Sequence, residues 1–359
     1  MNPRELLKGV IDDLLCNDGF VVIEVPDISL INNVQNINAR NKVNLKAMFP
    51  ECGFKKDIVI EIPTNFPSHL QVPSCDPHYQ PDTDVLINAL MWLVRPNGRS
   101  IWCFGPPGTG KTELWHFICS RIGLPMLVLS ATPDTQTDKL QGKFVLRNKG
   151  DGVETEFDLA AVADAMKHGV FCLLDEGDKL GPDTAASLHR VAEMKPWLIE
   201  DTKEVVHPGE WFRLAVCANT NGREANPAFP SSRVQDDAFL DRFNFITFDY
   251  LKPSKESEII AKAFPMIGMT TISTMLTVAN ALRDATLGPK VGRRRDASRT
   301  NGITALLTFR GLKSWADQMV KRGFEATLED CLETAFLAGL DSQTYVALMG
   351  DGGILRKVA

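Results

Sequence analysis

Gly105-Pro106-Pro107-Gly108-Thr109-Gly110-Lys111-Thr112 is the stretch of sequence that decides the fold of this chain. It has the spacing of a complete phosphate-binding loop, in which four residues separate a glycine from Gly-Lys-Thr. Its glycines let the backbone turn N–H groups toward a polyphosphate, where a Cβ atom would obstruct the bend or the ligand. In such loops the lysine, here Lys111, neutralises the β- and γ-phosphates, and the hydroxyl of Thr112 ligates Mg²⁺. The stretch therefore predicts that residues 105–112 bind a nucleoside triphosphate together with Mg²⁺.

The segments on either side of the loop follow the order that this chemistry requires. Residues 100–104 are a short apolar run that predicts a strand, and residues 113–119 predict a helix whose N-terminal dipole faces the phosphates. Apolar runs then alternate with helical patterns, and the periodicity is helical throughout from Lys255 onward. This alternation predicts a parallel α/β sheet followed by an all-helical lid. The further predicted strands are 126–130, 170–174, 212–217 and 243–250, and the further predicted helices include 82–94 and 304–319.

The predicted elements divide the chain into three regions. Residues 1–75 are a small appended region that begins with a helical stripe over 3–15 and whose function the sequence does not declare. Residues 76–251 form the α/β core, and residues 252–359 form the helical lid. Within the core, two short runs around a glycine turn predict a β-hairpin over 142–157.

Composition and charge limit the classes of function open to the chain. Its 359 residues are 44% hydrophobic and 23% charged, which is ordinary for a globular protein with a large core. The 39 basic and 45 acidic residues give a net charge of −6, so bulk electrostatics do not favour a polyanion such as nucleic acid. No apolar run approaches the roughly 20 residues of a membrane span, and the N-terminus lacks the apolar core of a secretion signal. The eight scattered cysteines include no Cys-x-x-Cys pair and predict a reducing, cytoplasmic location.

Two adjacent acids supply the partner that a phosphate-binding loop needs. Asp175 and Glu176 directly follow the apolar run 170–174. At the tip of a strand Asp175 can hold Mg²⁺ through water, and Glu176 can polarise the attacking water. Asn219 ends the next strand but one and can orient the same water, although a strand-end asparagine also serves simply as a turn residue.

Two arginines each have an ordinary and a catalytic interpretation. Arg242 immediately precedes the last core strand, where it is either a surface ion-pair residue or a cation that reaches the γ-phosphate of a neighbouring subunit. Arg310 lies on the predicted lid helix, where it either faces solvent or folds over the phosphates.

In this order the motifs resemble the AAA+ ATPases, and more narrowly the MoxR branch and within it CobS, the ATPase subunit of aerobic cobalt chelatase. The resemblance covers roughly residues 72–340. Besides the phosphate-binding loop, the general AAA+ motifs are Leu173–Glu176, Phe212–Leu214 with Ala218–Thr220, and Leu240–Arg242. The narrower marks are Val72-Pro73, Asp76-Pro77, Tyr79, Thr155–Phe157, Arg190-Val191, His207-Pro208, and Arg310 with Ser314–Ala316.

The resemblance implies an αβα sandwich that binds ATP and Mg²⁺ and assembles into a homo-oligomeric ring, typically of six subunits. It implies that Asn219 is the sensor-1 residue, Arg242 the arginine finger and Arg310 the sensor-2 residue. Arg233 is a rival candidate for the finger. The resemblance also places the hairpin 142–157 at the helix-2 insert of MoxR-type proteins, and a second hairpin insert before sensor 1, at 198–206.

Three functions are compatible with these motifs. The first is a ring that hydrolyses ATP to remodel or activate a protein partner, as MoxR-type proteins do with von Willebrand A-domain companions. The second is the motor subunit of a metal chelatase for cobalt or magnesium. The third is a nucleic-acid-linked motor, against which the acidic net charge and the lack of a recognisable DNA-binding module argue. A basic loop at 289–301 is either a contact for nucleic acid or an acidic partner, or simply a solvated lid loop.

Overall fold

The computed structural model describes residues 21–22, 39–150, 152–224, 229–291, 294–295, 305–323, 325–350, 353 and 355. The helical stripe predicted over 3–15 lies outside the described residues. At the centre is a five-stranded sheet in the order β12-β4-β11-β8-β5, in which all neighbouring strands are parallel. Its strands are β4 (Ser100–Phe104), β5 (Met126–Ser130), β8 (Phe171–Asp175), β11 (Arg213–Ala218) and β12 (Phe243–Thr247).

The register of the sheet brings the carboxyl ends of its strands to one edge. Phe104 pairs with Ala218, and Ser130 pairs with Asp175. The residues that follow these strands therefore meet at the same edge, which in open parallel sheets is where ligands bind.

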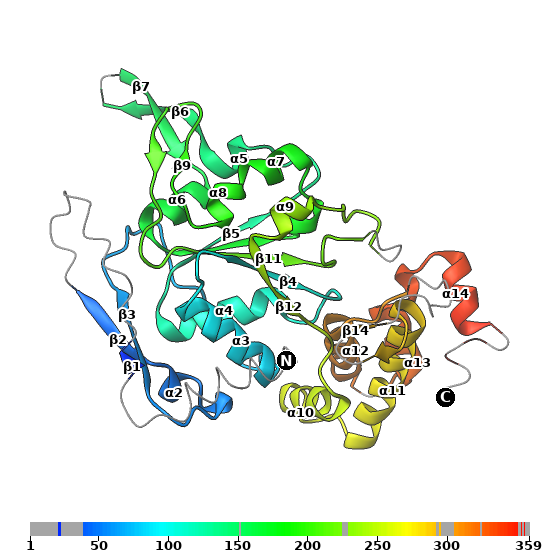
Figure 1. Cartoon of the computed structure of the whole chain (residues 1–359). Coiled ribbons are helices and arrows are strands. Elements are labelled where there is room, and N and C mark those ends of the chain that lie inside the picture. The colour runs from blue at the N-terminus through cyan, green and yellow to red at the C-terminus, as the bar shows by residue number, and fades with distance from the viewer. Residues whose placement is uncertain are drawn as a thin grey trace.

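Two apolar clusters cover the two faces of this sheet. Along β4, Ile101 and Cys103 belong to one cluster while Trp102 belongs to the other, as the two-residue repeat of a strand requires. Figure 1 shows helices on both sides of the sheet. These helices are α3 (Thr83–Val94), α4 (Lys111–Ile122), α5 (Asp138–Gln141), α6 (Ala161–His168), α7 (Pro182–Ser187), α8 (His189–Ala192) and α9 (Asp237–Leu240). The parallel α/β core predicted from the alternation of apolar runs is confirmed.

The described N-terminal part packs directly on this core. A small sheet in the order β1-β3-β2 contains β1 (Val21–Val22), β2 (Arg40–Asn44) and β3 (Ile58–Pro63), accompanied by α2 (Leu45–Met48) and η1 (Pro50–Cys52). Ile58, Ile60 and Ile62 are buried in the same cluster as residues of α3 and α4. The indole of Trp211 donates a hydrogen bond to the carbonyl of Glu61 (2.9 Å). The division at residue 75 therefore stays a proposal, since 39–63 and the core share one apolar cluster.

The C-terminal helices have an apolar core of their own, in which Trp315 is almost fully buried. They are α10 (Pro253–Ala263), α11 (Met269–Leu287), α12 (Phe309–Lys321), α13 (Leu328–Ala335), η4 (Leu337–Gly339) and α14 (Ser342–Met349). The helical C-terminal region predicted from the sequence is confirmed, and within the predicted loop 289–301 β13 (Lys290–Val291) and β14 (Arg294–Arg295) form an antiparallel ribbon. The helix predicted from residue 304 begins only at Phe309, since the hydroxyl of Thr308 caps its first turn.

Two hairpins project from the core. The first pairs β6 (Gly142–Lys149) with β7 (Gly152–Leu159), and the second pairs β9 (Trp197–Leu198) with β10 (Val205–Val206). The β6–β7 hairpin extends well beyond the sheet at the upper left of Figure 1, away from the C-terminal helices. Among the helices that the structure describes, none has both the length and the apolar character needed to span a bilayer.

Candidate nucleotide-binding site

The predicted phosphate-binding loop connects β4 to the N-terminus of α4, as the strand–loop–helix order requires. Gly105 has a φ of 151°, and a Cβ atom there would overlap the carbonyl oxygen of Phe248. Gly110 has a φ of 83°, and its Cβ would lie 2.8 Å from the ring of Tyr79. Both positions therefore require glycine, for backbone conformation and for space.

Lys111 is the buried cation of the loop. Its ammonium group donates hydrogen bonds to the carbonyls of Gly105 (2.8 Å) and Pro106 (2.9 Å) and lies 3.5 Å from Oδ1 of Asn219. Burial lowers the pKa of Lys111, because desolvation disfavours its charged form. The negative charges of a bound polyphosphate would stabilise the ammonium form, so the site is built for an anion.

Thr112 and Asp175 form the predicted Mg²⁺ pair. The Thr112 hydroxyl donates a hydrogen bond to the carboxylate of Asp175 (3.0 Å), so two oxygens from α4 and the end of β8 lie together. Hydroxyl and carboxylate oxygens are the donors that Mg²⁺ prefers, and one or two protein ligands with phosphate and water suffice for this ion. The residues present therefore fit Mg²⁺ at this position.

Glu176 directly follows this pair and adopts a left-handed backbone conformation with φ 56°. Its carboxylate accepts a 2.6 Å hydrogen bond from the ammonium group of Lys179, and its side chain is 45% exposed. A non-glycine residue in this conformation is uncommon and is often found at functional sites. Glu176 thus directly follows Asp175 in the chain and has a carboxylate that is partly exposed to solvent.

Asn219 reaches the site because Asp178 holds its backbone. One oxygen of the buried Asp178, in η2 (Gly177–Lys179), accepts hydrogen bonds from the backbone N–H groups of Asn219 and Thr220 (both 3.1 Å) and from the Ser232 hydroxyl (2.6 Å). This carboxylate connects the acidic segment to the end of β11. Asp178 was not among the predicted site residues, although it is a third acid only three residues after Asp175.

Two tyrosines from distant parts of the chain form hydrogen bonds with the phosphate-binding loop. The hydroxyl of Tyr79 donates to the carbonyl of Gly110 (3.0 Å), and the hydroxyl of Tyr250 donates to the carbonyl of Pro107 (2.8 Å). Burial raises the pKa of both phenols, so each stays a neutral donor at physiological pH. Tyr79 was noted in the sequence only as part of a resemblance, and nothing local marks either tyrosine as a contact of the loop.

A cavity of about 330 Å³ adjoins the loop. It lies between the loop residues 108–110, the segments 76–85 and 247–251, and the lid helices α10 and α12. Val85, Leu251 and Ile259 contribute apolar wall, while Arg310 and Lys313 bring positive charge from α12. Its size and its mixed lining match a small-molecule site, and its place beside the loop suits the base and sugar of a nucleotide.

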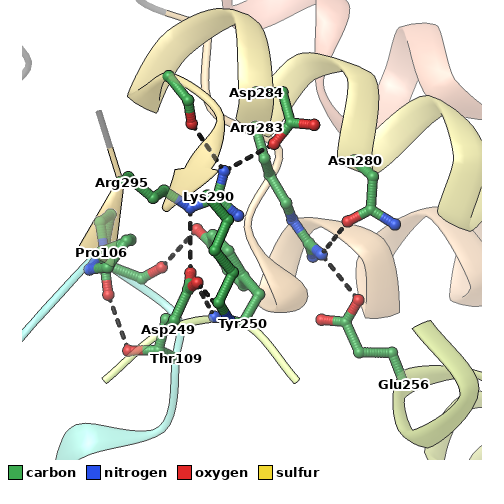
Figure 2. A network of polar contacts seen from close by, with 12 residues as sticks. Pro106, Thr109, Asp249, Tyr250, Glu256, Asn280, Arg283, Asp284, Lys290 and Arg295 are labelled. Carbon is green, nitrogen blue, oxygen red and sulfur yellow. Dashed lines mark hydrogen bonds and ion pairs between the residues drawn. The ribbon is translucent and has the colours of Figure 1, made fainter. Parts of the chain in front are cut away.

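A polar network joins the lid to the segment behind the loop (Figure 2). Asp249 is paired with Lys290 (2.9 Å) and Arg295 (3.1 Å), and Arg295 also contacts Asp284 (2.8 Å). Burial raises the pKa of Asp249, but these two cations outweigh it and leave the pKa below the ordinary aspartate value. The guanidinium of Arg283 stacks 3.8 Å from the centre of the Tyr250 ring. Two of the basic residues in the predicted loop 289–301 are therefore engaged within the protein, whereas Arg293 and Arg299 lie outside the described residues.

The structure places Arg242 at the opposite end of the sheet from the loop of its own chain. Its neighbour Phe243 pairs with Ser100 at the start of β4, four residues before the strand ends. At about 3.3 Å per residue this separation is about 13 Å along the sheet. Its guanidinium lies 3.2 Å from the carboxylate of Glu193. Arg233, the rival candidate, has an exposed side chain and a backbone N–H that donates to the carbonyl of Asp178 (2.7 Å).

Comparison with known proteins agrees with this geometry. Residues 102–243 match the family model described as an AAA domain of the dynein-related subfamily. Protein CbbQ of Hydrogenophilus thermoluteolus is 28% identical over 158 residues, which are 44% of this chain and 55% of CbbQ. The denitrification regulatory protein NirQ of Stutzerimonas stutzeri is 28% identical over 203 residues, 56% of this chain and 68% of NirQ. The match therefore spans little more than half the length of CbbQ.

Among solved structures, a RuvB mutant from Thermotoga maritima aligns with a TM-score of 0.44 and 16% identity, over 76% of this chain and 75% of that chain. CbbQ and NirQ fit the MoxR-type branch predicted from the sequence, whereas closeness to CobS stays a prediction. The family match falls on the strands and loops that build the site, from β4 to the start of β12. Residues 102–243, which contain the loop and the acids of the site, are therefore the part of the chain that matches an AAA domain of the dynein-related subfamily.

Proposed function

We propose that this chain is an ATPase that hydrolyses ATP with Mg²⁺ and uses the energy to remodel or activate a protein partner. The observation that carries the proposal is the contact between the Thr112 hydroxyl and Asp175, with the Lys111 ammonium within 3.5 Å of Asn219. Residues from α4, β8 and β11 thus converge on one edge of the sheet, although they are far apart in the sequence. A nucleotide-binding scaffold without hydrolysis would not require Glu176 and Asn219 beside the Mg²⁺ pair.

In this proposal each residue has one task in the hydrolysis. The loop N–H groups of residues 105–112 and the ammonium of Lys111 bind the phosphates, and Tyr79 fixes the loop. Thr112 and Asp175 hold Mg²⁺, which when bound neutralises charge on the phosphate oxygens. Glu176 accepts a proton from the attacking water, and Asn219 orients that water.

A positive charge from a neighbouring subunit completes the proposed site. About 13 Å of sheet separates Arg242 from the loop of its own chain, so it can serve a γ-phosphate only across an interface between subunits. This placement supports a closed ring, which the resemblance predicts to have six members. Arg310 approaches the cavity from α12 in the same chain and is proposed to contact the phosphates as the lid closes.

The β6–β7 hairpin is proposed to contact the partner. It projects from the core and exposes three apolar side chains, Phe144 (54% exposed), Leu146 (73%) and Val153 (63%). Exposed apolar side chains gathered on one projecting element are typical of a protein-binding surface. NirQ, which this chain resembles, is named a denitrification regulatory protein. The resemblance suggests a von Willebrand A-domain companion.

The two alternative functions have less support. The metal-chelatase motor rests on the resemblance to CobS alone. The basic loop 289–301 was the sequence feature that favoured a nucleic-acid motor. Two of its basic residues, Lys290 and Arg295, form ion pairs with Asp249 and Asp284 within the protein, which weakens this alternative.

The test of the proposed function is ATP hydrolysis by the purified full chain. We expect Mg²⁺-dependent release of phosphate that is abolished in Lys111→Ala, because that variant lacks the charge that binds the β- and γ-phosphates. Binding of a fluorescent ATP analogue should fall in parallel. Lys143→Ala, which removes an exposed lysine of the hairpin, is the matched control and should retain turnover. Absence of hydrolysis by the wild-type chain, despite tight ATP binding, would contradict the ATPase assignment.

A second prediction concerns the hairpin. Replacing residues 144–156 by a short Gly-Ser turn should leave basal ATPase activity measurable and abolish its stimulation by the partner, since among the described residues the removed strands form a two-stranded sheet separate from the central one. The partner is obtained by affinity purification on the Glu176→Gln variant with ATP bound.

The point variant Leu146→Ser, at the most exposed apolar side chain of the hairpin, serves as the milder comparison and should weaken the stimulation without changing basal turnover. Loss of the soluble, folded protein on removal of 144–156 would instead make the hairpin part of the structural core. Full partner stimulation without the hairpin would exclude it as the contact surface.

A further inference from the structure

A second cluster of potential ligands lies away from the nucleotide site. Nε2 of His69 is 2.9 Å from one oxygen of Asp164, and Nε2 of His168 is 3.4 Å from the other. The ligand atoms of all three residues lie within 4.8 Å of one another. No other group of this kind was found among the residues that the structure describes.

Two separate elements hold these side chains in place. Asp164 and His168 are four residues apart on α6, so they lie on the same side of that helix, while Val162 and Met166 are buried against the sheet. His69 comes from the segment between β3 and α3. Its neighbour Leu70 is buried in the same apolar cluster, and the carbonyl of Gln71 accepts a hydrogen bond from the N–H of Met126 (3.2 Å). Packing and a backbone hydrogen bond therefore fix the backbone on the carboxyl side of His69.

The donor set distinguishes between classes of metal ion. Two imidazole nitrogens and one carboxylate suit Zn²⁺, Co²⁺ and Ni²⁺, whereas Mg²⁺ and Ca²⁺ prefer sets made of oxygen atoms alone. From this arrangement we propose that His69, Asp164 and His168 bind one divalent transition-metal ion, with a further coordination position open to water or an external ligand. This ion is distinct from the Mg²⁺ of the nucleotide site.

The geometry needs little adjustment to accept such an ion. Ligand atoms about 2.0–2.1 Å from a tetrahedral zinc ion lie about 3.4 Å apart. Each nitrogen lies near this distance from one oxygen of Asp164, His69 at 2.9 Å from Oδ2 and His168 at 3.4 Å from Oδ1, so a rotation of the carboxylate or of an imidazole ring would bring all three side chains to one ion. The side chain of His69 is 57% exposed, so it can rotate to bring its nitrogen to the ion, and the 29% exposure of His168 leaves the position accessible from solvent.

A bound ion would link α6 to the segment that contains His69, two parts of the molecule that the nucleotide site does not connect directly. α6 begins two residues after the end of β7, so it carries the projecting hairpin. The segment that contains His69 continues to Asp76 and Tyr79, which line the nucleotide cavity. The metal would thus cross-link the base of the hairpin to the segment that leads into the nucleotide site.

The test is a metal titration of the untagged full chain after treatment with a chelator. Zn²⁺ is titrated by calorimetry, and Co²⁺ is titrated by absorption spectroscopy, which reports the ligand type. We expect one equivalent of each ion per chain, a raised thermal midpoint, and a cobalt spectrum without thiolate charge-transfer bands. His69→Ala and Asp164→Asn should each lower the affinity about tenfold or more, because even outer-shell changes cost 10- to 100-fold. His116→Ala, which removes a histidine outside the cluster, should bind normally.

Three results would overturn the proposal. They are the absence of a stoichiometric site for both ions, unchanged affinity in His69→Ala and Asp164→Asn, and a thiolate band that assigns the bound cobalt to a cysteine. The thermal midpoint of each variant without metal shows that it is folded. His69 is an exposed side chain, so its replacement tests metal binding even if Asp164→Asn disturbs α6.

Discussion

Arg242→Ala is expected to bind ATP normally and to lose about 10³-fold or more in turnover, the magnitude associated with arginine fingers in related phosphate-loop enzymes. The reason is geometric. Arg242 lies at the start of β12, opposite the carboxyl edge where its own chain would bind ATP, so its charge can act only on a neighbour. Steady-state phosphate release and equilibrium binding of an ATP analogue separate the two effects.

Mixing experiments show whether this arginine acts between subunits. The Arg242→Ala subunit has an intact phosphate-binding loop, and the Lys111→Ala subunit has an intact arginine finger. In a mixed ring, some interfaces therefore combine the intact loop of one subunit with the intact finger of its neighbour. We expect the mixture to regain activity that neither variant has alone. If no mixing ratio restores turnover although subunit exchange is demonstrated, Arg242 does not act across the interface.

Two further variants separate the alternatives at this position. Arg233→Ala tests the rival finger. Each arginine variant is mixed with Lys111→Ala and the ATP turnover is measured. Turnover that is restored in the mixture with Arg242→Ala, but not in the mixture with Arg233→Ala, assigns the finger to Arg242. Glu193→Gln removes the carboxylate that lies 3.2 Å from the Arg242 guanidinium within the chain. It should stay active if Arg242 matters for catalysis, whereas an inactive Glu193→Gln would indicate that this ion pair is needed for the fold.

The second large effect is expected at Glu176. Glu176→Gln should bind ATP with unchanged affinity and turn over about 10²- to 10⁴-fold more slowly, the range that a general base contributes. The amide has nearly the shape of the carboxylate, but it cannot accept a proton from water. Single-turnover hydrolysis checks the chemical step directly.

A matched control addresses the ion pair between Glu176 and Lys179, whose atoms are 2.6 Å apart. Lys179→Met removes that partner and leaves the carboxylate in place, so it should retain most of the turnover if Glu176 acts as the base. Wild-type turnover in Glu176→Gln would remove Glu176 from the mechanism and leave the water to be activated by another group.

Several features of the site could be predicted from the sequence because each depends on neighbouring residues. The loop 105–112 combines glycines with Lys111 over eight positions, and such a pattern has one structural solution between a strand and a helix. The apolar runs gave β4 and β5 with the boundaries observed and β8 and β11 within one residue. Local hydrophobicity determines these strands, so a single sequence is enough to predict them.

Other boundaries depended on contacts that no local pattern contains. The strand predicted to reach residue 250 ends at Thr247, because the chain then turns so that Phe248 packs against Gly105 and Tyr250 reaches Pro107. The loop near residue 290 became a ribbon because Lys290 and Arg295 pair with Asp249, about forty residues earlier in the chain. The spacing of hydrophobic residues in a sequence predicts local helix or strand, and it contains no information about partners that lie so far apart in the chain.

The sequence by itself determined the α/β core and the phosphate-binding loop from which nucleotide binding is predicted, because the loop, the acids at 175 and 176 and the strand pattern are local. Only the tertiary structure decided which distant groups complete the site. It brought Tyr79 and Tyr250 onto the loop and Asp178 beneath Asn219. It also separated Arg242 from the loop by the length of a strand and gathered His69 with Asp164 and His168. The physical reason is that sheet register and side-chain packing set these distances, and both depend on residues far apart in the chain.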